Sequence, residues 1–398
     1  MTDATPGRLG KPPTRRPKDL LYSESFRTAL YQVALAAGVV LLGLYLYQNV
    51  VENLGRQNIA TGFGFLDEVS QFEIGERLID YSSRDSYGRA LLVGLMNTLS
   101  VSAAGIVVAT VIGFAVGIMR VSTNWLLQRI ALTYVEIVRN IPVILQVIFW
   151  AAVIRNLPAP RQALDLWGLG FLSNRGLTFL LPAAHPAHVW MLAAFAAGIA
   201  AASVAARMAR RHREATGRYV DMLWPCIGLI LGPPVLVWLG FGAPHELSFP
   251  ERQGFNFTGG ATISPEFVAL MAGIALYSSG FIAEIVRAGI QATPRGQVEA
   301  ARSIALRPRF ILRYVVLPQA LRVIVPPLTS QYVSLIKNSS IAVVIGYPDL
   351  VNIGNTVMNQ TGQAVEAIAV MMTVFLAISL VTSLAMNFYN RLVAIKER

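Results

Sequence analysis

Charged side chains are scarce in this sequence of 398 residues, because only 14% are charged and 54% are hydrophobic. A soluble globular domain is usually about a quarter charged, so the composition argues against a protein surrounded by water. Histidine and cysteine are also rare, with four and one. The lone Cys226 excludes an intrachain disulfide. His185 and His188 have no acidic or cysteine neighbour that would complete a metal site.

Motifs that would give the chain its own energy source are absent. No phosphate-binding loop of the Gly-x-x-x-x-Gly-Lys-Ser/Thr type occurs, so any nucleotide is expected on another chain. A carrier driven by protons or sodium usually needs acidic residues near the bilayer midplane, and these are missing. We find no basic, aromatic-rich domain for nucleic acid. A clustered nucleophile, base or metal set, which a membrane-embedded enzyme would need, is lacking too.

Long apolar segments dominate the sequence instead. A helix needs roughly 20 mostly apolar residues to cross a bilayer, and the sequence predicts about eight such spans. They cover residues 29–50, 90–119, 130–154, 189–206, 222–241, 267–286, 323–345 and 368–388. We therefore expect an all-α, polytopic membrane protein. In the second span, small residues four positions apart predict a face for close helix packing. They are Gly105, Ala109, Gly113 and Gly117.

Lys and Arg residues are distributed unevenly between the two sides of these spans. Most of the 33 lie in the two tails and in the segments after the second, fourth and sixth spans, whereas residues 346–366 contain none. Basic residues gather on the cytoplasmic side of membrane proteins, so both termini are predicted to be cytoplasmic. This distribution explains the formal charge of +11 without a nucleic-acid partner.

The spans divide the chain into five parts. Residues 1–28 form a tail that is expected to be disordered, and residues 29–50 form an additional N-terminal span. Residues 51–86 form an extracytoplasmic loop with an expected amphipathic helix. Its apolar face consists of Phe65, Leu66, Val69 and Phe72. Residues 87–391 hold the remaining spans, and residues 392–398 form a cytoplasmic tail.

The cytoplasmic stretch between the sixth and seventh spans has the pattern of a short helix. It reads QVEAARSIALRPRFILRYVVLPQALR over residues 297–322. Its apolar stripe consists of Val298, Ala301, Ile304 and Ala305, and Pro308 ends or bends the helix. Such a helix either lies on the inner headgroups or docks into a groove of a soluble partner.

This stretch resembles the EAA loop of bacterial ABC-importer permeases, in which Glu-Ala-Ala is followed by a glycine, an isoleucine and a Leu-Pro pair. The matching residues are Glu299, Ala300, Ala301, Ala305, Val315, Leu317 and Pro318. The resemblance implies that the helix docks on a cytoplasmic ATPase and transmits its motion to the spans. Because Ala305 replaces the glycine, we expect a more regular helix at that position.

Other segments, among them YVEIVRNIPVILQVIFW and SLIKNSSIAVVIGYPDL, resemble permeases of the histidine/glutamine family. The added first span and the fourth and fifth spans, inserted within residues 155–257, resemble permeases of general L-amino-acid and glutamate/glutamine/aspartate/asparagine importers. The resemblance implies a permease subunit in a bacterial inner membrane, with no cofactor. It also implies two ATPase subunits, a related second permease and an extracytoplasmic binding protein. The runner-up interpretation is an ion-coupled secondary carrier.

Three residues within the spans are candidates for the translocation path. They are Glu284, late in the sixth span, and Lys337 and Asn338 in the seventh. A lysine at a helix centre costs about 2.5–3.5 kcal/mol on insertion scales, and such a charge is a functional hypothesis by default. For Lys337, the alternatives are a place in the bundle interior or pathway and snorkelling to the outer headgroups.

Overall fold

The computed structural model describes residues 24–56, 61–183, 185–217, 221–244, 246–254 and 256–393. Its longer helices are α2 (Glu24–Arg56), α3 (Tyr87–Arg120), α4 (Trp125–Asn140), α5 (Val143–Arg155), α6 (Pro186–Thr216), α7 (Leu223–Gly240), α8 (Pro265–Gln291), α11 (Leu317–Asn338) and α13 (Ala364–Val393). The shorter helical segments are η1 (Phe63–Asp67), η2 (Pro160–Gln162), α9 (Arg295–Ser303), α10 (Pro308–Ile311), η3 (Leu312–Val316), η4 (Ser339–Val344) and α12 (Leu350–Thr361).

Each predicted span corresponds to one of these helices or to a bent pair. Six helices of the described residues are long and apolar enough to cross a membrane, or seven with the pair α4 and α5, and α7 is a shorter apolar helix. The predicted all-α membrane fold is therefore confirmed. Most of the predicted N-terminal tail, residues 1–23, and residues 394–398 of the C-terminal tail lie outside the described residues.

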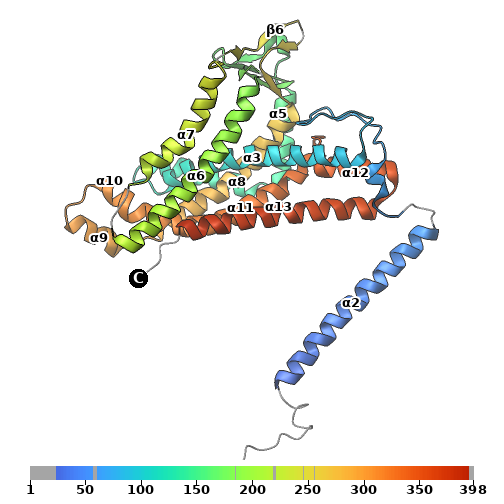
Figure 1. The fold of residues 1–398 in the computed structure, drawn as a ribbon, viewed down its shortest axis with the longest axis horizontal. Coiled ribbons are helices and arrows are strands. Elements are labelled where there is room, and N and C mark those ends of the chain that lie inside the picture. The colour runs from blue at the N-terminus through green and yellow to red at the C-terminus, as the bar shows by residue number, and fades with distance from the viewer. Residues whose placement is uncertain are drawn as a thin grey trace, which may run out of the picture.

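Helix α2 lies apart from the other helices (Figure 1). Its apolar side chains are exposed on all sides, for example 71% of Leu35 and 59% of Leu42. A helix that is hydrophobic all round requires an apolar environment. Helix α2 is therefore suited to the bilayer as the additional N-terminal span.

Helix α8 lies at the centre of the bundle, in contact with α3, α4, α5 and α11. Small residues make these approaches possible. A side-chain carbon at Gly113 of α3 would lie 2.6 Å from Ile282, and one at Gly117 would lie 2.7 Å from Val286. All four small residues of the predicted packing face on α3 are buried. The structure therefore confirms this face and identifies α8 as its partner.

The predicted third span is broken at Pro142, which separates α4 from α5 with a bend of 103°. Ile141, the residue before the proline, has an extended backbone, as proline favours. The side chain of Gln146 donates from Nε2 to the carbonyl oxygens of Val138 at 2.8 Å and Ile141 at 3.0 Å. A membrane protein must satisfy such carbonyls internally, so Gln146 stabilises the bend. The predicted third span is therefore a bent pair of helices.

The inserted region between α5 and α8 is a helical hairpin with a small β-structure at its base. The strands are β1 (Leu164–Asp165), β2 (Gly170–Ser173), β3 (Gly176–Phe179), β4 (Leu181–Pro182), β5 (Leu247–Ser248), β6 (Glu251–Gln253), β7 (Asn256–Thr258) and β8 (Ala261–Ile263). One antiparallel sheet has the order β1-β2-β3-β8, while β4 pairs with β5 and β6 with β7. Strands before α6 thus pair with strands after α7, which closes the hairpin at its base (Figure 1).

The outer loop before α3 is not the amphipathic helix that the sequence predicted. Helix η1 ends at Asp67, and Gln71 has a φ of 57°. The predicted apolar face does not form, because Phe65 is buried while Val69 is 48% exposed. The aromatic residues Phe65 and Tyr81 instead pack in a second core with residues of α3, α12 and α13.

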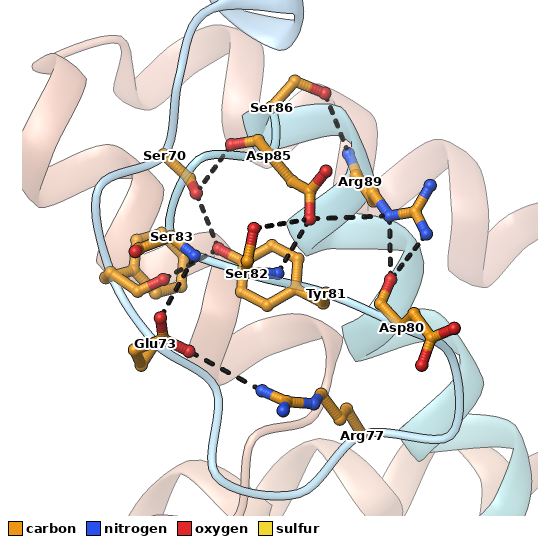
Figure 2. A network of polar contacts seen from close by, with 11 residues as sticks. Ser70, Glu73, Arg77, Asp80, Tyr81, Ser82, Ser83, Asp85, Ser86 and Arg89 are labelled. Atoms are coloured by element: carbon orange, nitrogen blue, oxygen red, sulfur yellow. Dashed lines mark hydrogen bonds and ion pairs between the residues drawn. The ribbon is translucent and has the colours of Figure 1, made fainter.

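Side-chain hydrogen bonds give this loop its shape (Figure 2). The Tyr81 hydroxyl donates to the carbonyl oxygen of Phe72 at 3.0 Å. The Asp85 carboxylate accepts from the N–H of Ser82 at 2.7 Å. Arg89 of α3 donates from Nε to the carbonyl oxygen of Asp80 at 2.9 Å. Such local bonds compete with a helical backbone, which explains why apolar spacing alone gave the wrong prediction.

Polar residues of α3 join this loop to the segment that precedes α12. Asn97 donates from Nδ2 to the carbonyl oxygens of Glu76 at 2.8 Å and Pro348 at 2.9 Å. The Thr98 hydroxyl accepts from the N–H of Leu350 at 3.0 Å. These contacts fix the start of α12 against α3.

Asp349 is a buried carboxyl group at the start of α12. Its Oδ1 accepts from the N–H of Asn352 at 2.8 Å, while Oδ2 has no hydrogen-bond partner in the described part of the chain. The residue is 0% exposed. Burial disfavours the carboxylate and raises the pKa of Asp349 from 3.8 to about 7.

We predict that Asp349 makes the protein less stable as the pH rises. The native state keeps the proton up to a pH of about 7, whereas the unfolded chain loses it near pH 3.8, so stability falls between these values. Asp349→Asn keeps an oxygen for the helix cap and removes the titration. At pH 8 this variant should unfold a few degrees higher than the wild type, and at pH 5 the difference should shrink. An equal pH dependence of both unfolding temperatures would contradict this assignment.

Candidate functional site

Helix α9 is short and presents one face to the bundle and one to solvent. It spans Arg295–Ser303, and Ala301 is its buried residue. Val298 is half-buried, whereas Glu299 and Ala300 are exposed. Ile304, which the sequence placed on the buried stripe, is 70% exposed. The apolar stripe therefore forms only in part, because the helix ends before Ile304.

The end of α9 depends on Ala305, which has a left-handed φ of 57°. The Ala305 N–H donates to the carbonyl oxygen of Arg302 at 2.9 Å, and the Leu306 N–H donates to that of Ala301 at 3.3 Å. This pair of bonds is the Schellman motif, which closes a helix at a left-handed residue. The prediction of a more regular helix at Ala305 was therefore wrong. The alanine adopts the glycine-type conformation and bears its strain, about 1–2 kcal/mol.

Helix α9 is connected to α11 through a π-helical turn. The turn, η3, covers Leu312–Val316 and leads directly into Leu317 and Pro318. Proline has no N–H to continue the usual α-helical bonding, and a π turn is one way to accommodate such a defect. Gln319 donates to the side chain of Gln297 on α9, and also to the carbonyl oxygen of Val315 at 2.9 Å. These bonds link α9 to the start of α11.

An apolar surface surrounds this connection. The exposed fractions are 70% for Ile304, 64% for Tyr314, 56% for Leu312 and 45% for Leu317. A cavity of about 670 Å³ lies beside it, and its lining includes Glu299, Arg302 and Val316. Large exposed apolar side chains rimmed by charged ones are typical of a contact with another protein or with the membrane.

Glu284 lies in a cluster of charges between α3 and α8. Its carboxylate accepts hydrogen bonds from Arg120 of α3 and from Arg287, one turn further along α8. The three side chains are 15% to 29% exposed. Removing one member of a partly buried pair leaves the other charge uncompensated. Glu284 therefore joins two helices, a role that the sequence spacing did not indicate.

Lys337 lies near the end of α11 and points away from the core of this chain. Its neighbours Leu335 and Ile336 are buried, whereas Lys337 is exposed and Asn338 half-buried. The structure thus excludes Lys337 from the interior of this chain's own bundle. Lys337 lines a groove of about 420 Å³, together with Met371, Met372 and Phe375 of α13. No salt bridge to Lys337 is found within the described ranges.

The end of the bundle that the distribution of Lys and Arg predicts to be extracytoplasmic also carries a pocket that the sequence did not predict. It has a volume of about 450 Å³ and lies between the outer loop, α8 and α12. Glu73, Glu76 and Glu266 line it, and the Ser264 hydroxyl donates to Glu76. Burial raises the pKa of Glu76. These residues are distant in sequence, so no local motif could have identified the pocket.

Comparison with known proteins gives a consistent result over nearly the whole chain. The family model described as "Binding-protein-dependent transport system inner membrane component" matches residues 194–396. The chain is 48% identical to a putative amino-acid ABC transporter permease protein, YhdX of Escherichia coli (strain K12), over 94% of this chain and 95% of that protein. It is 44% identical to the general L-amino acid transport system permease protein AapQ of Rhizobium johnstonii, over 96% of each.

A third relative is similar over the same length. It is the glutamate/glutamine/aspartate/asparagine transport system permease protein BztB of Rhodobacter capsulatus, with 38% identity over 95% of this chain and 96% of that protein. These relatives include the additional first span and the inserted hairpin, because the matches cover almost all of both chains.

We predict that Ala305→Gly stabilises the end of α9. Glycine removes the left-handed strain but adds freedom to the unfolded chain, so the net gain is about 0.5–1 kcal/mol. Hydrogen exchange of the amides in residues 295–306 should slow about two- to fivefold. The matched control is Ala300→Gly, which lies inside the helix and should speed exchange by a similar factor. Faster exchange in both variants would contradict the left-handed assignment.

Proposed function

This chain belongs to the inner membrane components of binding-protein-dependent transport systems, and we propose that it is the permease subunit of an ATP-driven importer of polar L-amino acids. The three relatives described above support the substrate class, since the name of each refers to amino acids. The observation that carries the mechanism is the exposed helix α9, which is joined to α11 by Gln297 and Gln319.

The energy for transport comes, in this proposal, from separate cytoplasmic ATPase subunits. The sequence has no phosphate-binding loop of its own. Two ATPase subunits would each contact one permease, and α9 is the part of this chain that suits the contact. Glu299 of α9 is exposed and charged, and the nearby Ile304 and Tyr314 are exposed and apolar. Together they would contact a groove of the ATPase. ATP-driven closure of the ATPases would push α9, and through it α11.

Two further partners complete the proposed importer. A related second permease would cover the groove beside Lys337, and an extracytoplasmic binding protein would deliver the amino acid to the outer face. The loop before α3 supports the role of the binding protein. Side-chain hydrogen bonds hold this loop in one conformation (Figure 2), and its residues 72–76 line the pocket. Preorganised surfaces lose less entropy on binding than mobile ones.

We propose that both termini and α9 are cytoplasmic, because most Lys and Arg residues lie on that side. A cysteine at Asn359, an exposed residue near the end of α12, should react in intact cells with a membrane-impermeant thiol reagent. A cysteine at Ser303 of α9 should react only after permeabilisation. Both variants need Cys226→Ser as background, and the opposite labelling pattern would reverse the orientation.

A charge reversal on α9 tests the coupling. We predict that Glu299→Lys abolishes transport-linked ATP hydrolysis in the assembled complex, because it replaces the carboxylate of the docking helix by a cation. The reversed charge would also reduce electrostatic complementarity at the contact, so the ATPase should dissociate more readily. Glu251→Lys, an equal charge reversal at an exposed site on β6, should transport normally. Normal coupling in Glu299→Lys would remove α9 as the docking element.

We propose that Lys337 lines the translocation path at the contact with the second permease. An exposed ammonium group between apolar residues of α11 and α13 would be costly against lipid, whereas a hydrated path between two permeases provides water and polar partners. The ammonium group would then be available to the carboxylate of an amino acid.

We therefore predict that Lys337→Met inserts and assembles normally but loses most uptake, because methionine keeps the apolar stem without the charge. Lys337→Arg should restore uptake only in part, since a planar guanidinium does not replace a compact ammonium group. Uptake of a radiolabelled amino acid into vesicles measures both. Wild-type uptake by Lys337→Met would instead support snorkelling to the headgroups.

A further inference from the structure

Arg120 and Arg287, which pair with Glu284, line a pocket together with Arg129 at the ends of α3 and α8 and the start of α4. We call it the arginine pocket. Its volume is about 260 Å³. The polar and aromatic residues that line it are Arg120, Trp125, Gln128, Arg129, Arg287 and Gln291. Three helices that are separate in sequence thus bring three guanidinium groups to one cavity.

The pocket has an excess of positive charge. Arg120 and Arg287 share the single carboxylate of Glu284, and Arg287 also donates to the Gln291 side chain. Arg129 is exposed, and no salt bridge or hydrogen bond of its side chain is found within the described residues. With three guanidinium groups and one carboxylate, the local charge remains positive. Guanidinium groups bind phosphate oxygens in pairs of parallel hydrogen bonds, so the pocket suits a phosphate group.

The surroundings of the pocket are apolar, which distinguishes a lipid from a soluble ligand. Trp125 is 73% exposed, Leu126 56% and Ile130 51%, and all three lie within four residues of Arg129 on α4. Tryptophan is enriched where a membrane meets water, and basic pockets between transmembrane helices on the cytoplasmic side bind anionic headgroups. A ligand with a phosphate group and an acyl chain would contact the arginines with its phosphate and the apolar side chains of α4 with its acyl chain.

We propose that the arginine pocket binds the phosphate group of an anionic phospholipid such as phosphatidylglycerol. Arg129 would hold the phosphate from α4, with Arg120 from α3 and Arg287 from α8. Trp125 and the neighbouring apolar side chains would contact the glycerol and acyl carbons. The lipid would thereby link α4, the first half of the bent pair, to the two central helices, and would reduce the repulsion between the arginines.

The test compares the assembled complex in lipid nanodiscs of two compositions. One contains phosphatidylcholine alone, and the other contains phosphatidylcholine with phosphatidylglycerol. The readouts are the unfolding temperature and the number of phosphatidylglycerol molecules that remain bound in native mass spectrometry. Phosphatidylglycerol should raise the unfolding temperature of the wild type. Arg129→Gln should bind this lipid about tenfold more weakly, as expected for the loss of a charge-assisted hydrogen bond.

Three controls make the result specific. Arg211→Gln removes an equal charge from an exposed position near the end of α6 and should retain the effect of phosphatidylglycerol. In phosphatidylcholine alone, Arg129→Gln should unfold at a temperature no lower than that of the wild type, which shows that the variant folds. Inorganic phosphate added to nanodiscs without anionic lipid should have no effect, because it lacks the acyl chains.

Three outcomes would overturn the proposal. The first is an equal response of the wild type and Arg129→Gln to phosphatidylglycerol, which would mean that the lipid acts elsewhere. The second is stabilisation by inorganic phosphate alone, through Arg129, which would identify a soluble phosphate ligand. The third is a loss of bound ATPase from Arg129→Gln with lipid binding unchanged, which would assign the pocket to a protein contact.

Discussion

The close approach of α3 to α8 is the contact on which the rest of the structure depends. At Gly113 and Gly117 no side chain separates the two helices, and Ile282 and Val286 fill the space that a side chain would occupy. The other faces of α8 receive α4 at Gly280, α5 at Gly273 and α11 at Gly289 in the same manner. Apolar side chains gain little from leaving lipid for a helix interface, so close van der Waals packing through small residues is what holds such a bundle together.

This packing places the proposed functional surfaces at opposite ends of the bundle. Helix α8 begins at the outer pocket with Glu266 and ends near α9 and the arginine pocket. Helix α11 packs on α8 through Ile324 and is joined to α9 through Gln319. In the proposed mechanism, a displacement of α9 would pass through Gln319 to α11, which ends at Asn338 next to Lys337. Because Ala305 has a left-handed backbone, α9 ends at Ser303 and the chain changes direction after it.

The sequence was sufficient to predict the helices and the packing face but not the breaks between them. Long apolar runs and the spacing of Gly105, Ala109, Gly113 and Gly117 are local signals, and the structure confirmed them. The bend at Pro142 depends on Gln146, whose bonds to preceding carbonyl groups appear only in the folded chain. The loop before α3 departed from prediction because side-chain hydrogen bonds outweighed its helical spacing. Ala305 departed from it because the backbone bonds of a Schellman motif close α9 at that residue. Lys337 stood out in the sequence as a charge within a span. The direction of its side chain depends on which helices pack against α11, and the sequence alone does not show them.

The central claim is that this permease moves polar amino acids with energy from ATP. The most direct test is uptake by the complete complex in sealed proteoliposomes, with the binding protein outside and ATP inside. A panel of radiolabelled amino acids identifies the substrates. We expect accumulation that requires ATP and persists when ionophores collapse the proton and sodium gradients. Accumulation that needs an ion gradient and proceeds without ATP would contradict the account.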